Sequence, residues 1–322
     1  MSEVSSSAVS VILPVLNEEN YLEHAVDAIL NQDFKGEIEV VLAIGPSKDL
    51  TMEIAKSIVQ RDSRVLIVEN PTGKTAAGLN LAIANSHHPI IVRVDGHANI
   101  PNNYISVAVE LIKKTGAANV GGVMAAEGQN PFENAVARAM RSPLGVGGAK
   151  FHTGGAAGEV DTVYLGVFKR SALLEVGGFD EHFTRAQDWE LNYRLRQKGG
   201  KIYFDPRMTV TYRPRRSLKA LARQYFEYGR WRRVVTRTHR GTINYRYLAP
   251  PITLIGTLLS LIGAIINPLL LIPAAIYGAF VLIASLLIGK SFLERIYLPF
   301  VLITMQMSWG AGFITSSRKL VR

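Results

Sequence analysis

The first hundred residues alternate between short apolar runs and segments with a helical pattern. The apolar runs are rich in Val, Ile and Leu, as buried strands are, and they cover 9–13, 39–44, 64–68 and the stretch that ends at Asp95. The segments between them repeat apolar residues at helical spacing or consist of small residues, and they cover 21–30, 49–59 and 74–85. This alternation predicts an α/β domain with a mostly parallel sheet and right-handed crossovers.

The pattern is less regular after residue 116. The segment 145–158 holds six glycines in 14 residues, which indicates a mobile loop that is either a plain linker or a lid. The segment 161–168 is strand-like. The segment 189–197 is a short amphipathic helix, and the glycines that follow it are typical of a helix end.

Two long uncharged runs follow in the last quarter of the chain. From 248 to 289 there are 42 residues without Asp, Glu, Lys or Arg, and from 296 to 317 there are another 22. A membrane-spanning helix needs about 20 apolar residues. The first run is interrupted by Asn267-Pro268 and predicts two helices in a tight hairpin, while the second run predicts a third. We therefore expect about three transmembrane helices, near 248–267, 268–289 and 296–317.

The net charge of +10 is concentrated just before these runs. Between Asp205 and Tyr247 the chain has eleven Arg and one Lys against two acidic residues, so the remainder is about neutral. Such a block can bind nucleic acid or anionic lipid. The adjoining apolar runs favour membrane lipids with anionic headgroups, and we expect no nucleic-acid partner. Within the block, 218–235 predicts an interfacial amphipathic helix with aromatic and arginine side chains.

The basic block also predicts an orientation, because cytoplasmic loops tend to be basic. Residues 1–247 are then expected in the cytosol, as part of a multi-pass plasma-membrane protein. Three spans would leave the basic tail 318–322 on the other side, so either the first block overrides this tendency or one segment is re-entrant. The chain has no cysteine, which excludes disulfides and thiolate metal sites. Residues 1–8 do not have the pattern of a cleavable signal peptide.

The stretch Asp95-Gly96-His97 carries the most informative chemistry. It follows a strand-like run, and ligands of open α/β sheets collect at the carboxyl ends of the strands. Asp95 offers a hard oxygen and His97 a borderline nitrogen, a pair that suits a divalent cation bound to phosphate oxygens. The alternative is a strand that leaves the sheet through a polar turn.

Several motifs in a fixed order sharpen this interpretation. These motifs are Pro14-Val15-Leu16-Asn17-Glu18, Ser47-Lys48-Asp49-Leu50-Thr51, Asp95-Gly96-His97, Gly177-Gly178-Phe179-Asp180 and Gln187-Asp188. In them the chain resembles the inverting family 2 glycosyltransferases of the GT-A fold, and among these the membrane-bound enzymes of succinoglycan-type exopolysaccharide synthesis. The resemblance covers roughly residues 8–235.

The resemblance implies a cation and a general base. Asp95 and His97 would hold a divalent cation that neutralises charge on the leaving diphosphate. The family usually has Asp-x-Asp here, so the imidazole of His97 favours Mn²⁺ over Mg²⁺. Asp188 is the candidate base for the acceptor hydroxyl, with Asp180 or Glu190 as alternatives if it is dispensable. A structural helix-cap carboxylate is the other interpretation of Asp188.

The resemblance also implies a donor site at the first strand ends. The candidate nucleotide-sugar ligands are Pro14, Asn17, Glu18, Ser47, Asp49, Lys74 and Asp95. The family often has an acidic pair before the serine, whereas this chain has Ile44-Gly45-Pro46, so the donor is left open between UDP- and GDP-sugars. Lys74 is either a phosphate ligand or a solvated lysine.

Gln224 and Arg230-Trp231 match the element of processive family members that closes on the acceptor and diphosphate. Their spacing is wider here, which argues against long-chain polymerisation, and a pure membrane anchor is the alternative.

These features predict a catalytic domain at 1–212, a basic juxtamembrane segment at 213–247 and a transmembrane domain at 248–322. The expected activity is transfer of a sugar from a nucleotide sugar to a hydroxyl of a lipid-linked acceptor, in exopolysaccharide or cell-envelope glycan synthesis. Other polysaccharide-assembly proteins are candidate partners. A polyprenyl-phosphate sugar synthase is the nearest alternative enzyme, and a non-catalytic glycan-assembly scaffold is the alternative outside enzymes.

Overall fold

The computed structural model describes residues 8–321 and divides into two compact units. The first unit comprises Met1–Ala125 and Gly154–Tyr212, and the second comprises Ala126–Thr153 and Arg213–Arg322. Residues 126–153, which lie within the predicted catalytic domain of 1–212, therefore belong to the second unit. The segment 1–8, for which the sequence predicts no signal peptide, lies outside the described residues except for Ala8.

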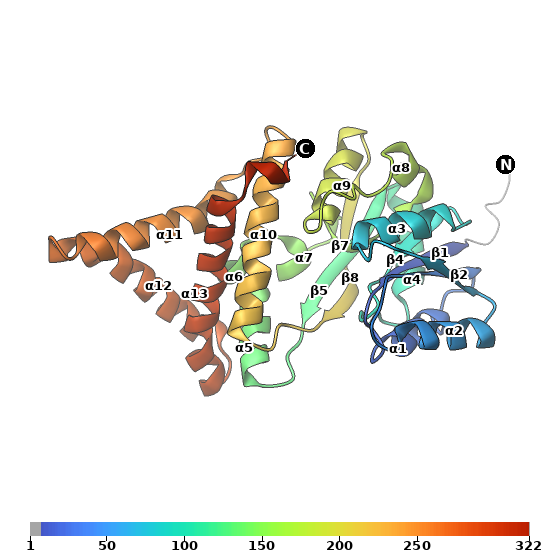
Figure 1. Ribbon diagram of the computed structural model, residues 1–322, viewed down its shortest axis with the longest axis horizontal. Coiled ribbons are helices and arrows are strands. Elements are labelled where there is room, and N and C mark those ends of the chain that lie inside the picture. Colours follow the sequence, from blue (N-terminus) through green and yellow to red (C-terminus); the bar gives the residue numbers. More distant parts are fainter. Residues whose placement is uncertain (1–7, 322) are drawn as a thin grey trace. The chain divides into compact units, whose positions relative to one another are not determined.

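Strands and helices alternate through the first half of the first unit (Figure 1). The strands are β1 Val9–Val15, β2 Ile38–Ile44, β3 Val65–Glu69, β4 Ile90–Arg93, β5 Asn119–Ala126, β6 Gly158–Glu159, β7 Tyr164–Lys169 and β8 Ile202–Tyr212. The helices are α1 Leu22–Leu30, α2 Thr51–Arg61, α3 Thr75–Ala84, α4 Tyr104–Thr115, α8 Arg170–Glu175 and α9 Gln187–Gln197.

Within the described chain these strands form one eight-stranded sheet with the order β3-β2-β1-β4-β7-β5-β8-β6. The first four strands are parallel, as the alternation predicts. β7 then pairs antiparallel with both β4 and β5, and β6 pairs antiparallel with β8. The sheet is therefore mixed.

The period of two along β1 sends its side chains to opposite faces of the sheet. Val9, Val11 and Leu13 pack into one core with α1, α2 and α4. Ile12 packs into the other core with α3, α8 and α9. Helices on both faces bury the sheet, which explains why its strands are almost continuously apolar.

Two sequence predictions differ from the structure near the site. The fourth strand ends at Arg93, not at Asp95, because residues 95–98 form a turn in which the Ala98 amide donates to the Asp95 carbonyl over 2.8 Å. The glycine-rich segment 145–158 is not a plain loop. It includes the end of the short helix α6 Pro143–Val146 and all of α7 Lys150–Thr153, and both helices belong to the second unit.

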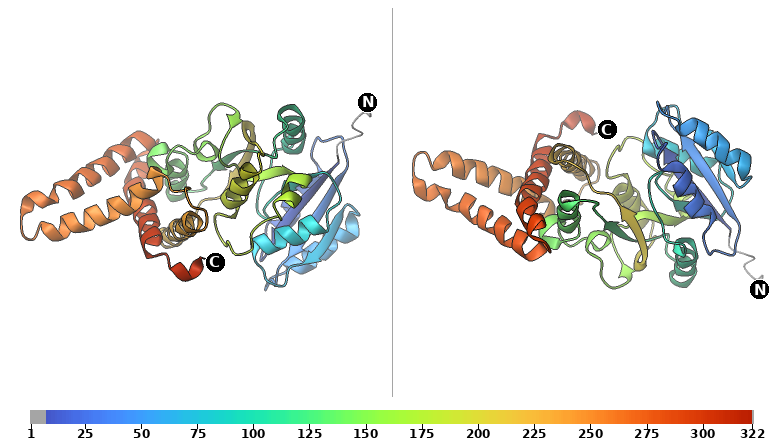
Figure 2. Two further views of the ribbon diagram at one scale, coloured as in Figure 1. Left: turned by 90° about the horizontal axis from the view of Figure 1, so that it is seen from above. Right: turned by 90° about the horizontal axis from the view of Figure 1, so that it is seen from below.

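The second unit is helical. Besides α6 and α7 it contains α5 Pro131–Met140, α10 Leu218–Thr238, α11 Tyr245–Gly263, η1 Pro268–Leu271, α12 Ile272–Ile288, α13 Phe292–Thr315 and η2 Arg318–Leu320. α11 and α12 form an antiparallel hairpin, and α10 lies beside α13 (Figures 1 and 2). Three stretches of the described chain are long and apolar enough to cross a membrane, namely Tyr245–Gly263, Pro268–Ile288 and Phe292–Thr315.

Candidate functional site

Asp95, Gly96 and His97 follow β4 at the carboxyl end of the sheet. A Cβ added to Gly96 would lie 3.1 Å from Cγ of Glu18. The absence of a side chain at Gly96 therefore lets the side chain of Glu18 pack against this turn. Glu18 Oε1 lies 2.8 Å from Nδ1 of His97. The turn after β4 is therefore held against the end of β1 by a carboxylate–imidazole pair.

The buried guanidinium of Arg93 joins the two carboxylates that carry the predicted chemistry. Its Nε and NH2 groups donate to Oδ1 of Asp95 over 3.2 and 3.0 Å. Its NH1 group donates to Oδ1 of Asp188. The guanidinium also lies 5.8 Å from the centre of the Phe179 ring. Arg93 thus brings Asp188 beside Asp95, although the two are 93 residues apart in the chain.

The charges of this group shift its pKa values. Burial lowers the pKa of Arg93, but the charges of Asp188 and Asp95 outweigh burial, so its pKa lies above the usual range. Burial raises the pKa of Asp188, and the opposing charge of Arg93 does not cancel this effect. Asp188 is therefore a stronger base than an ordinary aspartate.

Asp188 lies in the first turn of α9, and the residue directly before this helix has an unusual backbone. Ala186 has φ of 61°, in the left-handed region, and turns the chain into the helix. Glu190, an alternative base, is buried in a two-bond ion pair with Arg194, with both distances at 2.7 Å. Asp180, the other alternative, accepts a hydrogen bond from the His182 amide over 2.9 Å.

The turn that supplies Phe179 is anchored by α3. Asn80 accepts from the Phe179 amide and donates to the Phe179 carbonyl, both over 2.8 Å. Gly178 has φ of 74°, and a Cβ there would lie 2.6 Å from Oδ1 of Asn80. The close approach of Asn80 therefore requires glycine at 178, while Gly177 has open space around it and is favoured by its φ of 76°.

The loops after β1 and β2 are bound to each other. The Asn17 amide donates to Oγ of Ser47 over 3.0 Å, and the Lys48 amide donates to Oδ1 of Asn17 over 2.8 Å. The Glu18 amide donates to Oγ1 of Thr51 over 2.8 Å. These bonds fix the two loops at the carboxyl ends of adjacent parallel strands, where Pro14 belongs to the end of β1.

Asp49 completes this connection. One of its carboxylate oxygens accepts from the Glu19 amide over 3.2 Å, and the other accepts from the Thr51 hydroxyl over 2.6 Å. The Thr51 hydroxyl holds the pKa of Asp49 below its usual range. Ser47 and Asp49 therefore have a structural duty, and their contact with a ribose stays a prediction.

Lys74 is exposed and precedes α3 in a turn formed by Asn70, Thr72 and Gly73. A Cβ on Gly45 would lie 3.1 Å from Cα of Gly73, so this turn lies against the loop after β2. The predicted donor ligands thus come from neighbouring loops of one sheet edge. Their contact with a donor stays a prediction.

The donor set of Asp95 and His97 fits a cation that shares its coordination with phosphate. Among residues 8–321 no cluster of three or more Asp, Glu, His or Cys side chains could hold a metal alone. Cations of this class are commonly bound through one or two protein ligands and substrate phosphates. Two side chains at the carboxyl end of the parallel strands are consistent with that arrangement, and their binding of a cation stays a prediction.

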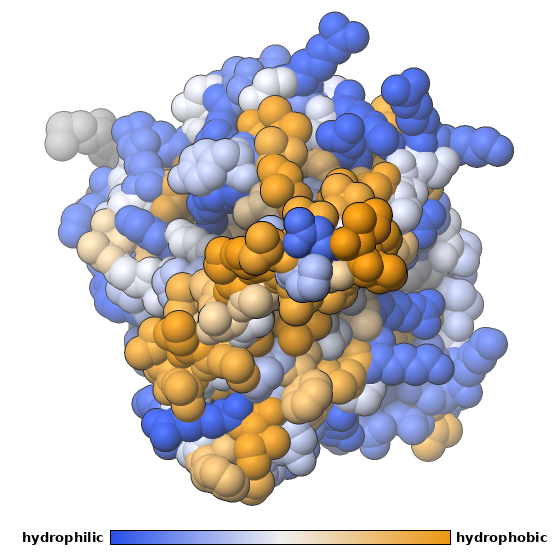
Figure 3. Space-filling model, turned by 90° about the vertical axis from the view of Figure 1, so that its left-hand side faces the viewer, coloured by the Kyte–Doolittle hydropathy of each residue, from blue (hydrophilic) through white to orange (hydrophobic). Residues whose placement is uncertain are grey.

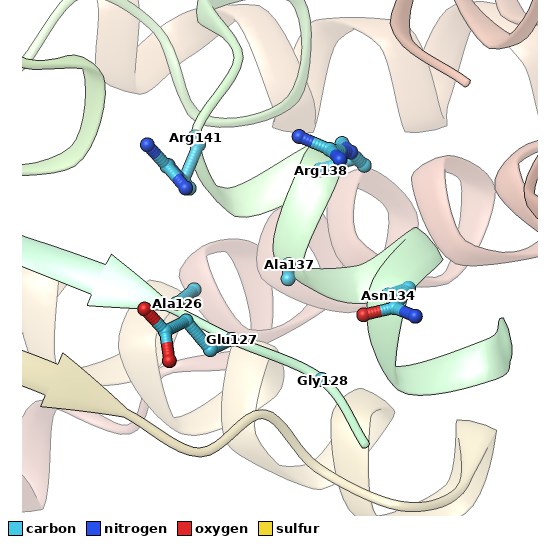
Figure 4. Close-up of a pocket in the computed structure, with 7 residues that line it drawn as sticks. All are labelled: Ala126, Glu127, Gly128, Asn134, Ala137, Arg138 and Arg141. Carbon is cyan, nitrogen blue, oxygen red and sulfur yellow. The ribbon is translucent and has the colours of Figure 1, made fainter. Parts of the chain in front are cut away.

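Gln224, Arg230 and Trp231 lie on α10, in the second unit. Gln224 donates to the Tyr228 hydroxyl over 2.7 Å, Arg230 pairs with Glu227 over 3.2 Å, and Trp231 is buried. Their closure on an acceptor stays a prediction. The second unit also contains a cavity of about 280 Å³ that includes none of the predicted site residues (Figure 4). It is lined by Ala126, Glu127, Gly128, Asn134, Ala137, Arg138 and Arg141.

The sequence prediction missed Arg93, Thr51 and Asn80. A signal for Arg93 was present, because a charged residue inside the run Ile90–Val94 must be buried and needs partners. Thr51 ends the motif Ser47-Lys48-Asp49-Leu50-Thr51, but the motif gives it no role of its own. Asn80 is an ordinary polar residue in a helical segment, and its sequence context does not distinguish it.

Comparison with known proteins gives a family match and relatives that cover almost the whole chain. Residues 10–177, more than half of the chain, match the family described as "Glycosyl transferase family 2". The succinoglycan biosynthesis protein ExoA of Rhizobium meliloti (strain 1021) is 32% identical over 97% of this chain and 95% of its own length. A dolichyl N-acetyl-alpha-D-glucosaminyl phosphate 3-beta-D-2,3-diacetamido-2,3-dideoxy-beta-D-glucuronosyltransferase of Methanococcus voltae is 27% identical over 95% of each chain.

Two solved structures are similar along almost the whole chain. Mannosyltransferase PcManGT from Pyrobaculum calidifontis, in complex with GDP-Man and Mn²⁺, has a TM-score of 0.62 at 21% identity, covering 97% of this chain and 88% of that one. S. aureus TarS 1–349 in complex with UDP-GlcNAc has a TM-score of 0.53 at 16% identity, covering 96% and 91%. At these identities they establish the fold, and the predicted GT-A fold is confirmed.

Proposed function

Because the chain belongs to glycosyl transferase family 2, we propose that it transfers one sugar, with inversion, from a nucleotide sugar to a hydroxyl of a lipid-linked acceptor. The acceptor oxygen attacks the anomeric carbon, and the bond from that carbon to the diphosphate breaks. The nucleoside diphosphate leaves on the opposite face. The hydroxyl proton passes to Asp188.

The contact of Arg93 with both Asp95 and Asp188 carries this proposal. One planar guanidinium bonds to both carboxylates and so sets the direction of the base relative to the donor edge. Arg93 is a positioning residue in this scheme. Burial keeps Asp188 more basic than an ordinary aspartate, which suits proton removal from an alcohol.

Asp95 and His97 would hold the divalent cation. When bound, the cation neutralises the charge that develops on the diphosphate. The imidazole nitrogen supports Mn²⁺ over Mg²⁺, and the mannosyltransferase PcManGT is a complex with Mn²⁺. Glu18 bonds to His97 and would orient its ring for that role.

The donor would lie along the bound loops after β1, β2 and β3. Pro14, Asn17, Glu18, Ser47 and Asp49 would surround the nucleoside, and Lys74 would meet a phosphate. PcManGT is a complex with GDP-Man and TarS is a complex with UDP-GlcNAc, so both nucleotides remain candidates.

The acceptor would be lipid-linked and would meet the enzyme at the cytosolic face of the plasma membrane. The three apolar helices agree with this location. The relative from Methanococcus voltae, whose name contains a dolichyl phosphate sugar, agrees with this kind of acceptor. Gln224, Arg230 and Trp231 would close on that acceptor.

The test separates Asp188 from its neighbour Asp180. Asp188→Asn should reduce turnover by about 10²- to 10⁴-fold, the usual contribution of a general base, with donor affinity nearly unchanged. Asp180→Asn is the matched control, since an asparagine can still accept the His182 amide, and it should retain turnover. Retained turnover in Asp188→Asn with a hydroxyl acceptor would contradict the proposal, and transfer to a polyprenyl phosphate instead would support a phosphate acceptor.

A further inference from the structure

The helix α10 packs along the C-terminal half of α13. Cβ atoms added to Gly229 and Gly312 would each lie 1.9 Å from a backbone oxygen of the other helix, those of Trp309 and Phe226. Such contact requires glycine at both positions. The two helices therefore touch backbone to backbone.

Polar bonds continue this contact to the end of α13. The Ser316 hydroxyl donates to the Arg230 carbonyl over 3.0 Å, and Arg237 donates to the Ser316 carbonyl over 2.9 Å. The Arg233 guanidinium lies 4.9 Å from the centre of the Phe313 ring. A long stretch of α10 thus follows α13 from Trp309 onward.

The N-terminal half of α13 is covered by α5 and α6. Arg138 lies 3.6 Å from Glu294, and the rings of Phe132 and Tyr297 meet edge to face at 5.7 Å. Further along, Gln306 donates to the Leu144 carbonyl over 3.1 Å. α5 contains charged residues and is not an apolar spanning helix, and α6 has only four residues.

The composition of α10 conflicts with a spanning α13. α10 carries six basic residues and one acidic residue in its 21 positions, the basic ones being Lys219, Arg223, Arg230, Arg232, Arg233 and Arg237. If α13 crossed the bilayer, α10 would enter the hydrocarbon with it, and so would Arg138 of α5. Charged side chains at that depth are costly and rare.

The hairpin of α11 and α12 has the opposite character. Its tip exposes large apolar side chains, with Ile265 85% and Ile266 87% exposed, and hydrophobic side chains gather on this face (Figure 3). Its polar groups bond internally: Ser260 donates to the Leu270 carbonyl over 2.6 Å and accepts from the Ala274 amide over 3.0 Å. α11 has 19 residues, or about 28 Å at about 1.5 Å each, close to the hydrocarbon thickness of about 30 Å.

The side chains of α13 divide into two faces at helical spacing. One face is buried in the helical unit and includes Leu298, Val301, Leu302, Met305 and Phe313. The other face is apolar and exposed, and it includes Leu293, Ile296, Phe300, Ile303 and Ile314. A helix held on one face by a basic helix and apolar on the other has the pattern of an interfacial helix.

We propose that only the α11–α12 hairpin enters the bilayer, and that α13 lies flat in the headgroup zone with its exposed apolar face against the acyl chains. α10 lies on the same side, where its exposed Lys219 and Arg223 would meet the anionic headgroups. The basic residues Arg318 and Lys319 then stay on the side of α10, as the positive-inside tendency requires. This arrangement is independent of the catalytic proposal.

The cysteine-free chain allows a direct test of sidedness. Full-length Lys219→Cys, Lys319→Cys and Asn267→Cys variants are exposed, in cells, to a membrane-impermeant maleimide before and after permeabilisation. Both lysine positions are exposed, and we expect them to label from the same side, whereas Asn267→Cys at the hairpin tip should label from the opposite side or be shielded. Labelling of the two lysine positions from opposite sides would overturn the proposal, as would labelling of the tip from the side of Lys219. The unsubstituted chain is the blank.

Depth measurement supplies a second, independent readout. Spin labels at Ile296, Ile303 and Ile314 should report nearly the same shallow depth in lipid vesicles. A spanning α13 would instead separate the first and last label by about 27 Å at about 1.5 Å per residue. A graded depth profile of that size would overturn the proposal, even if one cysteine variant failed to fold.

Discussion

The two sides of the candidate site are held by different kinds of contact. On one side a buried charge, Arg93, bonds to the carboxylates of Asp95 and Asp188. On the other side the loops after β1 and β2 are joined mainly by hydrogen bonds that involve backbone amides, such as those of Asn17 and Glu18. A buried ion that loses its geometry leaves an unpaired charge, whereas a lost amide bond has a modest cost. Changes on the first side should therefore affect turnover, and changes on the second should affect stability and donor binding.

The largest effect is expected for Arg93→Lys. A lysine keeps the charge, but its single ammonium group cannot reproduce the fork that bonds to both carboxylates. Misplacement of the base by about 1 Å can cost about 10²-fold, so kcat should fall by at least about that factor. Steady-state kinetics with donor and acceptor check it. Arg194→Lys, which alters a partly exposed arginine paired with the buried Glu190, is the control, and equal loss of kcat per folded molecule in both would reduce Arg93 to a structural role.

Metal removal tests the same side of the comparison. Chelation should abolish turnover, and Mn²⁺ should restore it better than Mg²⁺, because His97 supplies a nitrogen ligand. His97→Asp should shift this preference toward Mg²⁺, since it adds a hard oxygen donor. Full activity of the chelated wild-type protein, or equal restoration by both metals in both proteins, would show that His97 does not select the cation.

The pH dependence of turnover is a smaller effect. Asp188 must be ionised to accept a proton, and burial raises its pKa. The turnover rate should therefore be maximal at neutral pH. On acidification it should fall, and this fall should begin at a higher pH than the usual pKa range of an aspartate predicts. A pH profile of kcat at saturating donor and metal measures this. An acid limb at or below the ordinary aspartate range would argue against Asp188 as the base.

The smallest effect is expected for Thr51→Val on the other side of the site. The valine cannot accept the Glu18 amide, which should cost about 1 kcal/mol of unfolding free energy, with kcat nearly unchanged. The hydroxyl also lowers the pKa of Asp49, so its stabilisation is present above the unfolded pKa of that carboxyl and is lost as pH falls through the folded one. The difference in unfolding free energy between Thr51→Val and wild type should therefore shrink in acid. Thr51→Ser, which keeps the hydroxyl, should have nearly wild-type stability. Denaturant unfolding at two pH values checks both.

The parallel half of the sheet could be predicted from the sequence because its strands and helices follow one another with clear periodicity. The antiparallel pairing of β7 with β4 and β5 could not, because Ile91 and Phe168 are partners across 77 residues and no local pattern encodes their register. In the same way, the motifs indicated Asp95, His97 and Asp188 separately. Their common contact with Arg93 depends on the fold.

The helical unit shows the same limit in another form. Hydropathy predicts α11, α12 and α13 as similar apolar segments, which the three candidate spans confirm. It does not report how much of each segment is buried: 39% of the most apolar 18-residue stretch in α13, but only 11% of that in α11. That difference arises because α10 and α5 pack against α13, and this packing is visible only when the helices meet.

Ala186 has a consequence for how this enzyme could be engineered. Its left-handed backbone is a conformation that a glycine adopts freely and an alanine adopts with strain. Replacement by glycine would relax that joint and at the same time widen the range of directions in which the first turn of α9 can point. Removal of this one methyl group would therefore raise thermal tolerance and lower catalytic precision.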